Sequence, residues 1–230
     1  MTIKLAIVNN QPAIFHTLQG EGPYAGTPAV FIRTAVCNLT CTWCDTPYTW
    51  DWSRYPKEKH MGTYSISNVC ACIQDYNPQH IVFTGGEPLL QQQALHLVLN
   101  QLHSEATIEI ETNGTKQPIP ELDRAVHAYN VSLKLPNSGQ PYTACIVPDS
   151  VRYFAHNKKA FFKFVVQTPV DIDAIIELAT TYAIPHTRIG LMPEGTDSHT
   201  LRVASPWVID ACLTHGFRFL DRLHIHIGIA

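Results

Sequence analysis

Strand and helix patterns alternate along most of the chain, and this alternation constrains the fold more than any other feature. Apolar runs rich in β-branched and aromatic residues predict strands at 29–35, 80–86, 107–114, 131–135, 161–166 and 188–192. Amphipathic patterns predict helices at 66–76, 88–103, 120–129, 170–183 and 205–216. Elements in this order form right-handed βαβ units around a mainly parallel sheet.

The number of predicted strands sets the kind of sheet. About six parallel strands are too few for a complete eight-stranded barrel, so we expect an α/β fold with an incomplete, splayed β/α barrel. We expect one domain over 1–230, in which 1–28 add an N-terminal hairpin with "LQGEG" (18–22) as its turn-rich end. The final segment, "RLHIHIGIA" (222–230), alternates like a strand and would place His224 and His226 on one face.

Polar, glycine-bearing segments follow several of these strands. A cysteine-rich loop follows 29–35, "TGGEP" (84–88) and "ETNG" (111–114) close two further strands, and "PNSG" (136–139) follows another. The carboxyl ends of parallel strands meet at one edge, where α/β proteins assemble their active sites. The sequence therefore predicts one site built from these loops.

Composition excludes several classes of partner. The 230-residue chain has a formal net charge of −3, which gives no general attraction to nucleic acid or anionic membranes. The apolar run at 5–8 is too short for a signal peptide, and no stretch approaches the roughly 18 apolar residues that span a bilayer. We expect a cytoplasmic enzyme without a nucleic-acid or membrane partner.

Three of the seven cysteines, Cys37, Cys41 and Cys44, lie in one short loop. In a reducing cytosol, clustered cysteines are more often metal ligands than disulfides. A zinc site needs four ligands, of which His60 could be the fourth. Three thiolates can instead hold three irons of a [4Fe–4S] cluster and leave the fourth iron open. Both alternatives remain open from this loop alone, whereas Cys70, Cys145 and Cys212 are expected to be core residues.

The segment "TGGEP" adds a second constraint. Gly85 and Gly86 allow close approach of the backbone, and Glu87 offers an acceptor for an amine. The alternative is an ordinary strand-to-helix turn with Pro88 at the first helical position.

Together, C-x3-C-x2-C and "TGGEP" resemble the radical S-adenosylmethionine (SAM) superfamily. "FHTLQGEGPYAGTPAVFIRTAVCNLTCTWCDTPYTW", "IEIETNGT", "SLKLPNSG", "LMPEGT" and "LHIHIGIA" resemble one family within it, the 7-carboxy-7-deazaguanine synthases of queuosine biosynthesis. The resemblance implies a homodimeric lyase that converts 6-carboxy-5,6,7,8-tetrahydropterin to 7-carboxy-7-deazaguanine with loss of ammonia. It also implies a [4Fe–4S] cluster, SAM, Mg²⁺ and a flavodoxin- or ferredoxin-like electron donor.

The resemblance also assigns roles to individual residues. The cluster ligands would be Cys37, Cys41 and Cys44, and Thr46 would bind Mg²⁺. Residues expected at the SAM site are Trp43, Asp45, Gly85, Gly86, Glu87, Ser132, Leu133, Lys134, Leu191, Met192, Pro193 and Glu194. Residues expected at the substrate are Leu18, Gln19, Gly20, Arg33, Thr84, His224 and Ala230. The chain departs from the family's usual pattern at Val36, where glycine is common, and at Leu133, where proline is common.

Two other functions share part of this pattern. A glycyl-radical-enzyme activating protein would have a similar cysteine loop but would act on a protein, and it gives no reason for "LQGEG" or Arg33. A non-catalytic zinc module is the second alternative. Individual residues also have simpler interpretations: Arg33 could be a surface cation at a strand end, and Thr46 could be a turn residue.

Overall fold

A single eleven-stranded sheet organises the chain in the computed structural model, which describes residues 1–102 and 105–229. Its order is β11-β10-β9-β8-β7-β6-β4-β1-β2, with β3 paired to β4 and β5 paired to β1. The strands are β1 (Thr2–Val8), β2 (Gln11–Pro12), β3 (Ile14–Leu18), β4 (Pro28–Thr34), β5 (Met61–Ser65), β6 (His80–Gly85), β7 (Thr107–Thr112), β8 (Ala128–Val131), β9 (Ala160–Val166), β10 (Ile189–Pro193) and β11 (Arg218–Phe219).

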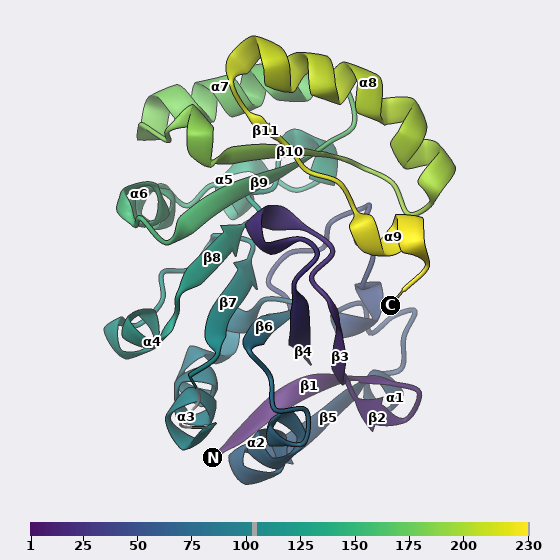
Figure 1. Ribbon diagram of the computed structural model, residues 1–230, viewed down its shortest axis with the longest axis vertical. Helices are drawn as coiled ribbons and strands as arrows, with labels where there is room; N and C mark the ends of the chain where they lie inside the picture. Colours follow the sequence, from purple (N-terminus) through teal and green to yellow (C-terminus); the bar gives the residue numbers. More distant parts are fainter. Residues whose placement is uncertain (103–104, 230) are drawn as a thin grey trace.

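The strands from β4 through β6 to β11 are parallel to their neighbours, as the βαβ pattern predicts. Within the described residues the strand order begins at β11 and ends at β2, so the sheet does not close. Figure 1 shows it as an open arc with helices along the outer side. The prediction of an incomplete barrel is confirmed.

The longer helices cover the outer face of the sheet because they present apolar residues to it. In α7, for example, Ile172, Ile175, Leu178 and Ala179 are buried at helical spacing. The α-helices are α1 (Lys57–His60), α2 (Ile66–Gln74), α3 (Gln92–Leu102), α4 (Pro120–Ala125), α5 (Tyr142–Cys145), α6 (Pro148–His156), α7 (Val170–Tyr182), α8 (Ser198–His215) and α9 (Leu223–Ile227). The 3₁₀ turns are η1 (Gly22–Tyr24), η2 (Pro47–Thr49), η3 (Pro88–Gln91), η4 (Pro136–Ser138) and η5 (His186–Arg188). None of the described helices is long and apolar enough to cross a membrane.

The N-terminal residues extend the sheet by antiparallel pairing. Strands β1 and β2 form a tight hairpin, and β3 pairs with β4 around the turn that contains "LQGEG". Strand β5 returns to pair with β1 along five residues from Met61 to Ser65. This short strand was not predicted, because "MGTYS" carries little apolar alternation.

Several element boundaries differ from the sequence prediction. The strand expected at 131–135 lies earlier, at β8, and the helix expected at 120–129 ends at Ala125. The helix expected at 88–103 begins as the 3₁₀ turn η3, and its expected last residue lies outside the described part of the chain. Helix α8 begins at Ser198, well before the expected start at 205, because the Asp197 carboxylate accepts hydrogen bonds from two backbone N–H groups at its N-terminus.

The prediction of a C-terminal strand is wrong. Residues Leu223–Ile227 form the short helix α9, which ends at Gly228 with φ +67°. Four alternating residues are too few to distinguish a strand from one helical turn, and β11 already occupies the sheet edge beside β10. His224 and His226 therefore do not share a strand face.

Candidate active site

A cavity of about 990 Å³ lies at the carboxyl ends of the parallel strands, where the sequence places its polar loops. Its wall includes the ends of β4, β6 and β7, the cysteine loop, the turn after β3 and helix α9. Of the residues predicted for the site, the following line it: Leu18, Gln19, Gly20, Arg33, Cys37, Cys41, Trp43, Cys44, Asp45, Thr46, Thr84, Gly85, Gly86, Ser132, Lys134 and His224.

The three loop cysteines face this cavity as free thiols. The backbone N–H of Leu39 donates to Cys37 Sγ at 3.5 Å, and the indole N–H of Trp50 donates to Cys44 Sγ at 3.3 Å. Burial raises the pKa of the Cys37 thiol to about 11 and also raises the pKa of Cys41. A bound metal centre would supply the positive charge that keeps such thiols deprotonated.

The three loop cysteines do not form a single-ion site among the described residues. Within the described residues, no three His, Cys, Asp or Glu side chains are close enough to hold one ion. In a [4Fe–4S] cluster each thiolate binds a different iron, so the sulfurs lie farther apart. His60, the possible fourth zinc ligand, packs instead against the rings of Tyr48 and Tyr55. Cys70, Cys145 and Cys212 are buried in the main core, as expected.

Val36, which precedes the first loop cysteine, has a strained backbone. Its φ of +77° lies in the left-handed region, which β-branched residues avoid. The loop enforces this conformation, because Val36 N–H donates to Thr49 O at 2.7 Å and Val36 O accepts from Glu87 N–H at 2.9 Å.

We predict that Val36→Gly stabilises the metal-free protein. The left-handed conformation costs an L-residue roughly 1–2 kcal/mol, and the extra chain entropy of glycine offsets about half of the gain. The melting temperature should therefore rise by about 2 °C. As a control, Val203→Gly at an exposed position of α8 should lower it. A lower melting temperature for Val36→Gly would contradict the assignment of strain.

The "TGGEP" segment brings the ends of β4 and β6 together. A side chain on Gly85, whose φ is +124°, would collide with the backbone of Thr34, and one on Gly86 would collide with that of Val36. Glu87 does not line the cavity: it is completely buried, and its carboxylate accepts hydrogen bonds from Leu89 N–H, Asn113 N–H and Thr112 Oγ1. The Glu87 carboxylate thus links the end of β6 to the end of β7. This geometry does not match the expectation that Glu87 accepts a hydrogen bond from an amine in the cavity.

The other residues expected at SAM divide into two groups. Ser132 and Lys134 line the cavity, where Lys134 Nζ donates to Ser132 Oγ at 2.7 Å and lies 5.3 Å from the Trp43 ring centroid. The residues of the second group do not line the cavity. Leu133 and Leu191 are in the core, Met192 belongs to a small cluster beside Trp43, Pro193 is buried, and Glu194 N–H bonds to β9.

On the substrate side, Arg33 extends from β4 into the cavity. Its guanidinium carbon lies 5.7 Å from the Phe15 ring centroid, and no carboxylate of the described residues forms an ion pair with it. Thr84 Oγ1 donates to Glu111 at 2.6 Å. Arg33 is therefore a free cation in the cavity rather than a paired surface charge.

Gln19, Gly20 and His224 form a compact corner of the cavity. The buried Gln19 amide donates to both Glu109 and Glu111, which leaves no amide hydrogen for a ligand. Gly20 O accepts from Leu223 N–H at 2.9 Å, and the His224 ring lies directly against Gly20. Ala230, also expected at the substrate, lies outside the described residues.

Comparisons with known proteins are consistent with this geometry. The profile of the radical SAM superfamily matches residues 31–205. A protein from Pyrobaculum aerophilum named 7-carboxy-7-deazaguanine synthase is 38% identical over 217 residues, which cover 92% of this chain and 91% of that protein. The chain belongs to the 7-carboxy-7-deazaguanine synthase family. A synthase from Halobacterium salinarum is 34% identical over an alignment that covers 92% of this chain and 87% of that protein.

Two solved structures share the fold of this 7-carboxy-7-deazaguanine synthase family member. The crystal structure of QueE from Escherichia coli aligns with a TM-score of 0.70 and 29% identity, over 97% of this chain and 95% of that one. Streptococcus suis SuiB bound to S-adenosylmethionine shares the fold, with a TM-score of 0.56, 14% identity and coverage of 84% of this chain and 49% of that one. Membership of this radical SAM family implies a [4Fe–4S] cluster and SAM, and it favours neither the zinc module nor the glycyl-radical activating protein.

An ion-pair network in this synthase-family cavity was missed by the sequence analysis. Lys163 Nζ lies 2.5 Å from one oxygen of Glu21, and Arg222 Nε lies 2.9 Å from the other. Arg222 also pairs with Asp45. One signal was available: Lys163 interrupts "FFKFVV", a strand that is otherwise apolar and buried on both faces. A lysine there requires a buried partner.

The network makes the stability of the protein depend on pH. Burial alone would raise the pKa of Glu21, but Lys163 and Arg222 outweigh it and lower that pKa to about 2, against 4.5 when unfolded. Because the pKa of Glu21 is lower in the folded state, the ion pairs stabilise the protein fully at pH values above the unfolded-state pKa. This stabilisation, on the order of 3 kcal/mol, is lost as the pH falls toward the folded-state pKa. Glu21→Gln should therefore flatten the fall in melting temperature between pH 5 and pH 3, and Lys163→Met should do the same. An unchanged slope in both variants would contradict the ion pairs.

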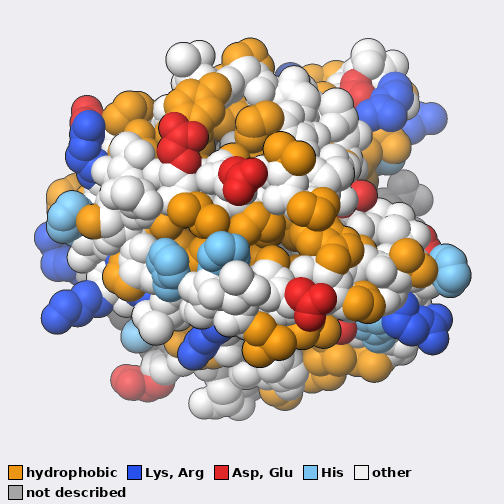
Figure 2. Space-filling model, turned by 90° about the horizontal axis from the view of Figure 1, so that it is seen from above, with side chains coloured by type: hydrophobic (Ala, Val, Ile, Leu, Met, Phe, Trp, Pro, Cys, Tyr) orange, Lys and Arg blue, Asp and Glu red, His pale blue; other side chains and the backbone are white. Residues whose placement is uncertain are grey.

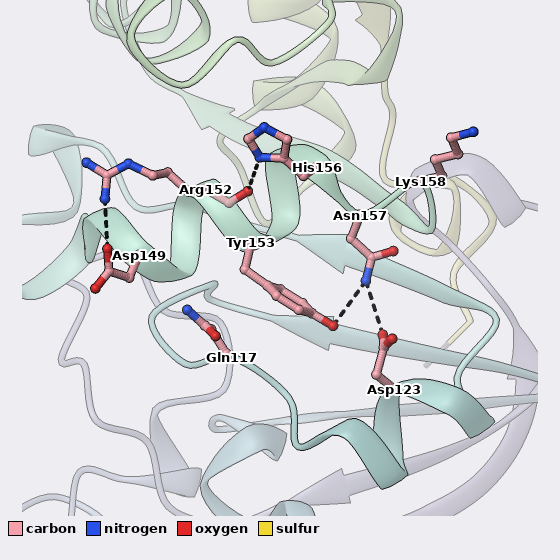
Figure 3. A pocket seen from close by; sticks show the side chains of 8 residues that line it. All are labelled: Gln117, Asp123, Asp149, Arg152, Tyr153, His156, Asn157 and Lys158. Atoms are coloured by element: carbon pink, nitrogen blue, oxygen red, sulfur yellow. Dashed lines mark hydrogen bonds and ion pairs between the residues drawn. The ribbon is translucent and has the colours of Figure 1, made fainter.

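A second hollow, of about 690 Å³, lies on the outer surface beside α4 and α6 (Figure 3). Several of its polar groups bond to one another: Asn157 donates to Asp123 and to the Tyr153 hydroxyl, and Arg152 pairs with Asp149 at 2.7 Å. The hydrogen bond from Asn157 to Asp123 links the end of α6 to α4. We therefore place the candidate active site in the first cavity.

Proposed function

We propose that this protein is a 7-carboxy-7-deazaguanine synthase. It converts 6-carboxy-5,6,7,8-tetrahydropterin to 7-carboxy-7-deazaguanine with loss of ammonia, within queuosine nucleoside biosynthesis. The two ligands of this reaction, SAM and the pterin, each carry a carboxylate. The cavity must therefore offer two separate positive groups while it keeps its other charges neutralised.

The observation that carries the proposal is the charge balance of the cavity. Of the lining carboxylates, Glu21 and Asp45 are neutralised by Lys163 and Arg222. The third, Glu111, accepts hydrogen bonds from the Gln19 amide and the Thr84 hydroxyl. Among the described lining residues, Arg33 and Lys134 are the cations left without a carboxylate partner, and they extend from β4 and from the loop after β8. A guanidinium gives a carboxylate two parallel hydrogen bonds, so Arg33 suits the pterin carboxylate, and Lys134 suits that of SAM.

Residues of the same cavity wall would also hold the cofactors. Cys37, Cys41 and Cys44 would hold the cluster, with SAM against Gly86, Ser132 and Lys134. When bound, the cluster and SAM supply one-electron chemistry that begins with removal of a hydrogen atom from the substrate. The chain's own residues orient both ligands and exclude bulk water.

Mg²⁺ would bind at Thr46, whose hydroxyl lies at the cavity 3.8 Å from Cys44 Sγ. One neutral oxygen is a weak magnesium site, so substrate oxygens and waters must complete the octahedron. Mg²⁺ should therefore bind detectably only when the pterin is present. Isothermal titration with and without the pterin measures this directly.

We also propose a homodimer and a flavodoxin- or ferredoxin-like electron donor. Figure 2, which looks onto the end of the molecule where α7 and α8 lie, shows apolar side chains gathered in the middle of that face. Val170, Val203 and Leu213 are each at least 66% exposed on these helices. Light scattering should give twice the mass of one chain, and Leu213→Glu should lower it.

The test of the proposed function is turnover by the cluster-loaded protein. Under anaerobic conditions with SAM, Mg²⁺, a reductant and the carboxytetrahydropterin, we expect 7-carboxy-7-deazaguanine by mass spectrometry. A protein that cleaves SAM to 5′-deoxyadenosine but forms no deazaguanine product would refute the substrate assignment and leave the superfamily intact.

A further inference from the structure

One buried guanidinium, that of Arg222, connects four segments around the cavity. Arg222 is 8% exposed and immediately precedes α9. Its Nε donates to Glu21 at 2.9 Å, its Nη1 donates to Gly195 O at 2.7 Å, and its Nη2 donates to Asp45. These partners lie in the turn after β3, in the loop after β10 and in the cysteine loop.

Arginine suits this position for a geometric reason. Its planar guanidinium has five donors fixed in one fork, so a single side chain can hold two carboxylates and a carbonyl in a set arrangement. Without it, Glu21 would keep only Lys163 as an ion-pair partner, and Asp45, whose side chain is 47% exposed, would lose its link to the turn after β3. Lysine has one nitrogen and can keep only part of this pattern.

The two ends of the network belong to different ligands under the proposed function. Asp45 adjoins Cys44 and lies on the SAM side of the cavity. Glu21 follows the corner made by Gly20 and His224, on the substrate side, where Leu223 N–H is fixed to Gly20 O at 2.9 Å. A ligand that fixes the position of α9 would therefore also fix the position of Arg222, and Arg222 would hold the Asp45 carboxylate.

We propose that Arg222 is a positioning residue that couples pterin binding to SAM binding. This inference rests on the proposed function, since it requires that both ligands occupy the cavity. Binding of the pterin against α9 holds Arg222 in place, and Arg222 holds Asp45 beside the cysteine loop. By thermodynamic reciprocity, SAM strengthens pterin binding by the same factor.

The experiment measures the SAM dissociation constant of the cluster-loaded protein with and without saturating pterin, in the absence of a reductant so that no turnover occurs. For the unaltered protein we expect the pterin to tighten SAM binding about five-fold or more, the lower end of common coupling factors. In Arg222→Met this factor should fall to about one, and in Arg222→Lys it should be intermediate. Arg218→Met, which changes an exposed arginine four residues earlier, should keep the full factor.

A second measurement separates positioning from a merely structural role. With reductant present, the ratio of deazaguanine product to SAM cleaved should fall in Arg222→Met and recover partly in Arg222→Lys, because cleavage next to a misplaced substrate is unproductive. If Arg222→Met does not fold, Arg222→Lys carries both tests. An unchanged coupling factor in a folded Arg222 variant, or no coupling in the unaltered protein, would overturn the inference even if the product forms. Absence of product from the unaltered protein would instead refute the proposed function.

Discussion

Cys41→Ala should abolish the iron–sulfur cluster and all turnover. Under the proposed ligation, Cys41 holds one of the three cysteine-bound irons, and among the described lining residues the only other thiols are the remaining two ligands, Cys37 and Cys44. The anaerobically reconstituted protein should contain about four irons per chain and absorb broadly near 400 nm, whereas the variant should do neither.

The matched control for this change is Cys212→Ala. Cys212 is 5% exposed, lies on the buried face of α8 in the main core and does not line the cavity. This variant should lose some stability to the small cavity it creates but keep its iron and its activity. Full iron content in Cys41→Ala, or stoichiometric zinc in the unaltered protein after careful reconstitution, would contradict the proposed cluster.

Arg33→Ala should weaken pterin binding by roughly thirty-fold or more. Removing one partner of a desolvated charge pair typically costs about 2–5 kcal/mol, and each 1.4 kcal/mol is a factor of ten. SAM binding should change little, because the proposal assigns the SAM carboxylate to Lys134 rather than to Arg33. Titration calorimetry with each ligand separately measures both effects.

Arg54→Ala provides the control for Arg33, since Arg54 is exposed and pairs with Asp51 outside the cavity wall. It should bind the pterin as the unaltered protein does. Equal pterin affinity in Arg33→Ala and Arg54→Ala would mean that the carboxylate binds elsewhere.

The sequence predicts the part of the site that depends on strand ends. The cysteine loop, the two glycines of "TGGEP" and Arg33 each lie at or after a parallel strand, and such positions converge at one sheet edge whatever the details of packing. The same logic predicts the open barrel, because the number of strands limits closure. The positions of these groups and the open barrel were therefore accessible from local patterns and spacing, whereas the role of Arg33 at the substrate came from the family resemblance.

The parts that sequence does not predict depend on contacts between distant segments. Glu21 and Lys163 are 142 positions apart, and Arg222 is 201 positions from Glu21. The orientation of Glu87, which points into the protein rather than into the cavity, is likewise decided by three donors that include Thr112 and Asn113 of the neighbouring strand end. Helix α9 was mistaken for a strand because its tertiary contacts to Gly20 outweigh a four-residue alternation.

The most direct test of the proposed function follows the hydrogen atom that the reaction removes. The cluster-loaded protein would be incubated anaerobically with SAM, Mg²⁺, a reductant and carboxytetrahydropterin that carries deuterium at C6. We predict that 7-carboxy-7-deazaguanine forms and that the 5′-deoxyadenosine released with it contains the deuterium. Deazaguanine product accompanied by unlabelled 5′-deoxyadenosine, or labelled pterin recovered unchanged while SAM is consumed, would contradict the account.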